Sequence, residues 1–71
     1  MLNTLRKHRF LNGEMTQEEV AQKIGVSRQT IIAIERGKYN PSVKLALKLA
    51  RLFGTTVEAL FQLEDSDENR P

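Results

Sequence analysis

The residues best suited to recognition chemistry stand at the start of one short candidate helix, over residues 28 to about 36. Arg28 and Gln29 open this helix, and both side chains can form paired hydrogen bonds. Ile31 and Ile34 share one face at helical spacing and are expected to point inward. The opposite face, near the N-terminus where side chains of a helix docked on DNA reach base edges, then carries Arg28, Gln29, Ile32 and Ala33.

These residues also have plainer interpretations. Arg28 and Gln29 could be solvated side chains of a first helical turn, although the helix dipole opposes a cation there and so favours a functional role for Arg28. Ile32 could be a core residue if the helix is rotated about its axis. The spacing does not choose between burial and contact for Ile32, and both stay open.

Two short helices that share one turn must position this face. Thr16 opens the first of them with Glu19 completing a capping box, and Gly25 ends it. Ser27 is a good N-cap for the second. The segment TQEEVAQKIGVSRQTIIAIERG, residues 16–37, therefore has the layout of a helix-turn-helix.

The rest of the chain also shows helical spacing, with no alternation long enough to predict a strand. We expect a first helix from about residue 4 to 11 behind a candidate Asn3 cap, a fourth from Ser42 to about residue 53, and a last turn or two ending near Leu63. The predicted fold is all-α, a compact domain of five helices over residues 1–63. Residues 64–71 are acidic and are expected to be disordered.

From residue 16 onward, TQEEVAQKIGVSRQTIIAIERGKYNPS closely resembles the XRE family of helix-turn-helix regulators, which includes the lambda-type phage repressors. The following helix is similar too, so the resemblance covers roughly residues 3–63. It is strongest to short stand-alone members that lack an effector domain. The resemblance implies a lambda-repressor-like fold and a sequence-specific transcriptional regulator, with repression as the expected mode, that binds double-stranded DNA at a palindromic operator as a homodimer.

The resemblance also implies roles for individual residues. Gln17 and Ser27 would hold phosphates at helix N-termini. Arg28 would pair with guanine and Gln29 with adenine, while Ile32 and Ala33 would face thymine methyls. The loop after the recognition helix would hold the DNA backbone. The predicted contact set is Gln17, Ser27, Arg28, Gln29, Thr30, Ile32, Ala33, Lys38, Tyr39 and Asn40.

Two residues of the first helix stand out beside this set. The resemblance suggests an ion pair between Arg9 and Glu35 that ties the first helix to the end of the recognition helix. His8 stands where relatives commonly have Leu, on the inward face. Because a metal site needs several clustered ligands, we expect His8 to be a partly buried structural residue.

The helix over residues 42–53 holds more apolar residues than one face of a small core needs. We assign Val43, Ala46, Leu49, Ala50 and Phe53 to the core. Leu45 and Leu52, one heptad apart, are then either tolerated exposed leucines or a dimer contact, and we favour the contact. The predicted dimer interface is Leu45, Leu52, Leu60, Phe61 and Leu63.

Charge and composition narrow the function further. Residues 1–63 hold ten Lys or Arg against five Asp or Glu, whereas residues 64–71 hold four acids against Arg70. The basic domain is compatible with nucleic acid. With one His and no Cys, no catalytic, metal or cofactor site is expected. No apolar stretch approaches the roughly 20 residues of a membrane span, and we expect a cytoplasmic protein.

Two other function classes compete with a DNA-binding regulator. A helix-turn-helix antitoxin would neutralise a toxin partner as well as bind DNA, and the acidic tail could be its inhibitory segment. A purely structural interaction domain is the third alternative. It is disfavoured by the candidate reading residues, and a DNA-binding assay would decide the matter.

Overall fold

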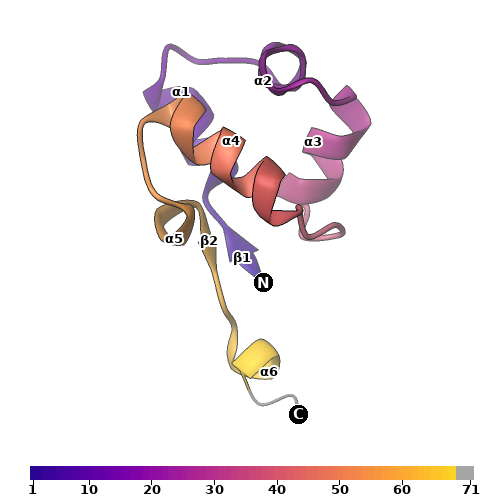
Figure 1. Ribbon diagram of the computed structural model, residues 1–71, viewed down its shortest axis with the longest axis vertical. Coiled ribbons are helices and arrows are strands. Elements are labelled where there is room, and N and C mark those ends of the chain that lie inside the picture. The colour runs from indigo at the N-terminus through magenta and orange to yellow at the C-terminus, as the bar shows by residue number, and fades with distance from the viewer. Residues whose placement is uncertain (69–71) are drawn as a thin grey trace.

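The computed structural model describes residues 1–68, and residues 69–71 lie outside the description. Within the described part, six helices and two short strands follow one another along the chain (Figure 1). In chain order they are β1 (Leu2–Asn3), α1 (Leu5–Leu11), α2 (Gln17–Ile24), α3 (Arg28–Glu35), α4 (Val43–Phe53), α5 (Val57–Leu60), β2 (Phe61–Gln62) and α6 (Asp65–Glu68).

Hydroxyl side chains fix where four of the helices begin. The side-chain oxygens of Thr16, Ser27, Ser42 and Thr56 each accept a hydrogen bond from the backbone N–H three residues on, at 3.1 to 3.3 Å. At Thr16 the box is closed, because the Thr16 N–H donates to Glu19 Oε1 at 3.0 Å. This backbone hydrogen bond and the Thr16 hydroxyl hold the pKa of the Glu19 carboxyl below its usual range. The predicted helix starts at Thr16 and Ser27 are confirmed.

Glycines end two of the helices in the left-handed conformation. Gly25, with φ of 78°, ends α2, and Gly54, with φ of 62°, ends α4. Since a side chain at such φ values is strained, glycine is the residue that allows these sharp stops. The stop at Gly25 sets the turn between α2 and α3.

The core lies where the helices meet. Helix α2 packs against both α3 and α4, and α4 packs against α5. The most deeply buried large side chains come from five different helices and are Leu5, Val20, Ile31, Ile34, Leu49 and Leu60. A core built from so many short helices leaves each of them dependent on its neighbours, because helices this short are not stable alone.

A two-residue strand pair joins the ends of the domain, which the sequence did not predict. Strand β1 runs antiparallel to β2, with Leu2 opposite Gln62 and Asn3 opposite Phe61. The expectation of a fold without strands is therefore wrong in this detail. Strands of two residues show no alternation, so the periodicity of the sequence does not reveal them.

Helix α4 is rotated relative to the prediction. Val43, assigned to the core, is 77% exposed, whereas Leu45, assigned to the surface, is only 9% exposed. The buried stripe follows helical spacing through Leu45, Ala46, Leu49, Ala50 and Phe53.

This rotation changes the predicted dimer interface. Leu60 and Phe61 are also buried in the core of the single chain, because α5 ends there and the chain turns into β2. Leu45, Leu60 and Phe61 are thus not exposed surface, and their assignment to a dimer interface is corrected. Leu52 is half-buried against the core, and Leu63 is 62% exposed.

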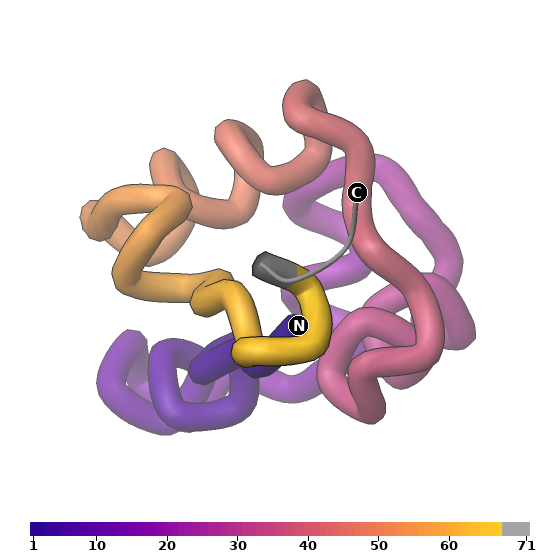
Figure 2. Tube along the Cα trace, turned by 90° about the horizontal axis from the view of Figure 1, so that it is seen from below, coloured from indigo at the N-terminus to yellow at the C-terminus, as the bar shows by residue number. Residues whose placement is uncertain are grey.

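The first residues of the acidic segment form a helical turn, which the sequence did not predict. Residues Asp65–Glu68 form one helical turn, α6, that lies beside the N-terminus (Figure 2). The Met1 amine binds Glu64 Oε1 at 2.9 Å and Asp67 Oδ2 at 3.0 Å. The hydrogen bond from this amine to Glu64 is the main cause of its raised pKa. The predicted disorder of residues 69–71 lies outside the described residues.

Candidate nucleic-acid interface

Helix α3 presents one buried and one exposed face. Ile31 and Ile34 are 0% and 1% exposed, so the inner face of α3 is buried in the core. Arg28 and Gln29 are exposed on the first turn of α3. Ile32 is half-buried and is not among the core residues. A sealed face opposite exposed hydrogen-bonding side chains is the arrangement that a reading helix needs.

The N-termini of α2 and α3 lie at one shallow groove. Gln17 from α2 and Arg28 and Ile32 from α3 all line it. Arg6 of α1 and Arg36, just after α3, line it as well, and the contact set predicted from the sequence included neither. Their position depends on how α1 packs against α3, for which the sequence offers no signal beyond the suggested ion pair.

The other predicted contact residues lie on α3, at its N-cap or in the loop that follows it. Ser27 is exposed and Thr30 is half-buried, and their hydroxyl oxygens lie 3.0 Å apart within the N-cap of α3. Ala33 is half-buried. The loop residues are exposed and lie directly after α3; they are Lys38, Tyr39 and Asn40.

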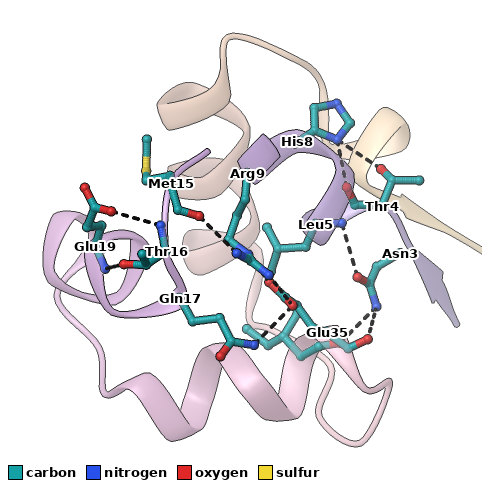
Figure 3. A network of polar contacts seen from close by, with 11 residues as sticks. Asn3, Thr4, Leu5, His8, Arg9, Met15, Thr16, Gln17, Glu19 and Glu35 are labelled. Carbon is teal, nitrogen blue, oxygen red and sulfur yellow. Dashed lines mark hydrogen bonds and ion pairs between the residues drawn. The ribbon is translucent and has the colours of Figure 1, made fainter. Parts of the chain in front are cut away.

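A buried ion pair holds α1 to the end of α3 (Figure 3). Arg9 Nε lies 2.6 Å from Glu35 Oε2, and Arg9 Nη2 lies 3.1 Å from Glu35 Oε1. The two side chains are 11% and 10% exposed. Gln17 Nε2 also donates to Glu35 Oε1 at 3.3 Å, and Arg9 Nη1 donates to the Met15 carbonyl at 3.0 Å. The ion pair suggested by the sequence is present, and it extends to α2.

Asn3 forms a second connection between α1 and α3. Its Nδ2 donates to the Ile34 carbonyl at 2.9 Å, and its Oδ1 accepts from the Leu5 N–H at 3.2 Å. Asn3, the candidate cap, thus bonds the first residue of α1. The N-cap itself is Thr4, one residue later. The Asn3 side chain also donates to a carbonyl at the C-terminal end of α3 that accepts the Gly37 N–H at 3.0 Å as well.

His8 has a structural position. It is half-buried, and its ring centroid lies 6.1 Å from that of Phe53. Its Nδ1 lies 2.9 Å from the Thr4 carbonyl oxygen and 3.1 Å from the Thr4 hydroxyl oxygen. His8 Nδ1 thus contacts Thr4, the N-cap of α1, while the ring packs near Phe53.

The geometry described above matches a known domain. The family model for the helix-turn-helix matches residues 5–60 of the chain. The chain belongs to the XRE-type helix-turn-helix family. Its members are DNA-binding transcriptional regulators rather than enzymes. In this regulator the pair α2 and α3 forms the helix-turn-helix, and α3 occupies the place of the recognition helix.

Individual relatives of this XRE-type regulator have the same character. An HTH-type transcriptional regulator from Methanocaldococcus jannaschii is 55% identical over 67 residues, which cover 94% of this chain and 100% of the relative. The cryptic phage CTXphi transcriptional repressor RstR of Vibrio cholerae is 38% identical over 96% of this chain and 56% of its own length.

A solved structure agrees with this assignment. The restriction-modification controller protein C.AhdI of Aeromonas hydrophila superposes with a TM-score of 0.71 at 35% identity, covering 80% of this chain and 85% of that protein. The predicted lambda-repressor-like fold of this XRE-type regulator is confirmed. Among residues 1–68, no helix has both the length and the apolar character needed to cross a membrane.

The first testable prediction concerns the Arg9–Glu35 pair. Arg9→Met or Glu35→Leu alone should destabilise the fold by about 3 to 5 kcal/mol, because each leaves one buried charge without its partner. The double variant should lose less than the two single variants together, since it removes both charges at once. Urea unfolding of all four proteins measures this coupling. Additive losses in the double variant would show that the pair is not coupled and contradict the account.

Proposed function

We propose that this regulator is a sequence-specific transcriptional repressor that binds a palindromic operator as a homodimer, with α3 of each copy in the major groove. The observation that carries the proposal is the exposed pair Arg28 and Gln29 on the first turn of α3, opposite a face that is fully buried. Repression needs only occupancy of DNA that other proteins must use. The name of the Vibrio cholerae relative, a transcriptional repressor, supports this direction of regulation.

In this proposal the reading residues differ in their chemistry. Arg28 pairs with a guanine and Gln29 with an adenine, because each side chain can form two hydrogen bonds to one base edge in the major groove. Ile32 and Ala33, half-buried on the adjoining part of α3, contact thymine methyl groups. These contacts determine the preferred sequence.

A second set of residues holds the DNA backbone. The capping box uses the N–H groups of Thr16 and Glu19, so the N–H of Gln17, in the first turn of α2, is available to a phosphate. Ser27 and Thr30 lie at the start of α3 beside the reading residues. The exposed loop after α3 completes the set with Lys38, Tyr39 and Asn40. Such contacts fix the orientation of α3 without reading sequence.

The dimer surface in this proposal is an exposed apolar face of α4. Val43 and Leu47, one helical turn apart, are 77% and 56% exposed. They line one apolar pocket with Pro41, Val57 and other residues. Monomeric proteins rarely leave contiguous apolar surface uncovered. We assign a second copy of the chain as its occupant, because this surface begins directly after the loop that follows α3 and so can pair two reading helices side by side.

The antitoxin alternative depends on the acidic segment after residue 63. Glu64 and Asp67 in that segment bind the Met1 amine of the same chain. Because these contacts serve the domain itself, we propose the regulator without a toxin partner and expect the expressed protein to purify as a single species. A regulator of prokaryotic genes acts where the DNA lies, so the proposal includes a cytoplasmic location.

The second testable prediction separates base readers from backbone holders. Arg28→Ala or Gln29→Ala should cost about 1 to 3 kcal/mol per half-site on the preferred operator and much less on random duplex, because alanine cannot form the bidentate pairing with a base. Lys38→Ala should weaken binding to every sequence about equally. It should also reduce the slope of log affinity against log salt by about 0.9 for each phosphate that the variant no longer binds.

Titration of each variant against operator, single-base variants and random duplex at several salt concentrations measures both effects. If Arg28→Ala weakens binding to all duplexes equally, Arg28 contacts the DNA backbone, and its role in reading a base is contradicted. Failure of the unaltered protein to bind any duplex would contradict the proposed function as a whole.

The third testable prediction concerns the dimer surface. Val43→Gln combined with Leu47→Gln should lower the sedimentation mass from a dimer to the 8.1 kDa monomer and weaken operator binding, because polar groups replace the apolar contact. Leu11→Gln is the matched control, since Leu11 is 68% exposed on α1 and lies outside the proposed surface. A monomeric unaltered protein at high micromolar concentration would contradict a preformed dimer.

A further inference from the structure

Three arginines, one from α1 and two from α3 and the residue after it, line one groove to which no role has been given. Arg6 projects from α1, Arg28 begins α3, and Arg36 follows α3, and all three line the same groove beside Gln17. The acidic residue at this groove is Glu35, whose carboxylate is already bound by Arg9 and Gln17. The groove therefore carries an excess of positive charge that suits an anion.

Arg6 is positioned by an aromatic ring on its own helix. Its guanidinium carbon lies 5.7 Å from the centroid of the Phe10 ring, within the range of a cation–π interaction. Phe10 is 51% exposed, so its ring is not needed to fill the core. Arg9 lies 5.6 Å from the same ring, but its charge is matched by Glu35. Among residues 1–68, Arg6 has no ion pair within the chain.

We propose that Arg6 binds a phosphate of the DNA backbone next to the bases that α3 reads, and that Phe10 orients its guanidinium for this contact. Arginine suits this role because its planar donor fork can hold two phosphate oxygens at once. The inference rests on the proposed function, since it extends the DNA surface from the helix-turn-helix onto α1. Arg6 is a backbone holder, whereas Arg28 at the same groove reads a base.

The test compares Arg6→Ala with a matched control, Arg51→Ala, which removes the same charge from an exposed position on α4 away from this groove. Arg6→Ala should weaken binding to operator and random duplex by the same factor, severalfold, and reduce the salt slope by about 0.9 for each phosphate released. Arg51→Ala should change neither by a comparable amount. Because both side chains are exposed, thermal unfolding should show that both variants keep their fold.

Phe10→Leu supplies an independent measurement. It keeps every charge but removes the ring, so it should lower affinity less than Arg6→Ala and leave the salt slope unchanged. If Arg6→Ala behaves like Arg51→Ala while the unaltered protein binds duplex DNA, the inference about Arg6 is wrong and the proposed function stands. If Arg6→Ala alters base preference instead, Arg6 reads a base and the inference is also wrong. If the unaltered protein binds no duplex, both fail together.

Discussion

The arrangement of helix α3 depends on the burial of one carboxylate. Glu35, the last residue of α3, is 10% exposed, and a charge removed from water to that extent must be paired. Arg9 from α1 and Gln17 from α2 both reach it. Satisfying Glu35 therefore requires the three helices to meet in one geometry. Desolvation offsets much of the attraction between these charges, so the pair adds little net stability compared with well-packed apolar residues, whereas loss of one partner is costly.

This convergence connects the fold to recognition. Gln17 begins α2, and its side chain bonds Glu35. Gln17 also lines the same groove as Arg28. Asn3 binds the Ile34 carbonyl near the same end of α3. Helix α3 is thus fixed at its C-terminal end by α1 and along its inner face by the core. Rigid support of this kind is what a reading face needs, because misplaced side chains cannot form the paired geometry of base contacts.

The parts of the structure that could be predicted from the sequence are those set by local chemistry. The caps at Thr16 and Ser27 and the stop at Gly25 each depend on residues within one turn, and they place α2 and α3 correctly. The rotation of α4 is predicted wrongly because this helix carries apolar residues around much of its circumference, so spacing alone fits more than one rotation. The turn α6 is missed because it contacts the Met1 amine, which lies at the other end of the chain. The place of Arg6 at the groove is missed because it is set by how α1 packs in the fold.

The central claim, that the first turn of α3 reads bases, is tested most directly by selecting bound duplexes from a random DNA pool. The unaltered protein should enrich an inverted repeat with half-sites about one helical turn, roughly 34 Å, apart. Selection with Arg28→Gln should return the same repeat with guanine replaced by adenine at one position of each half-site, because glutamine pairs with adenine. Enrichment without sequence preference, or an identical motif from both proteins, would contradict the claim.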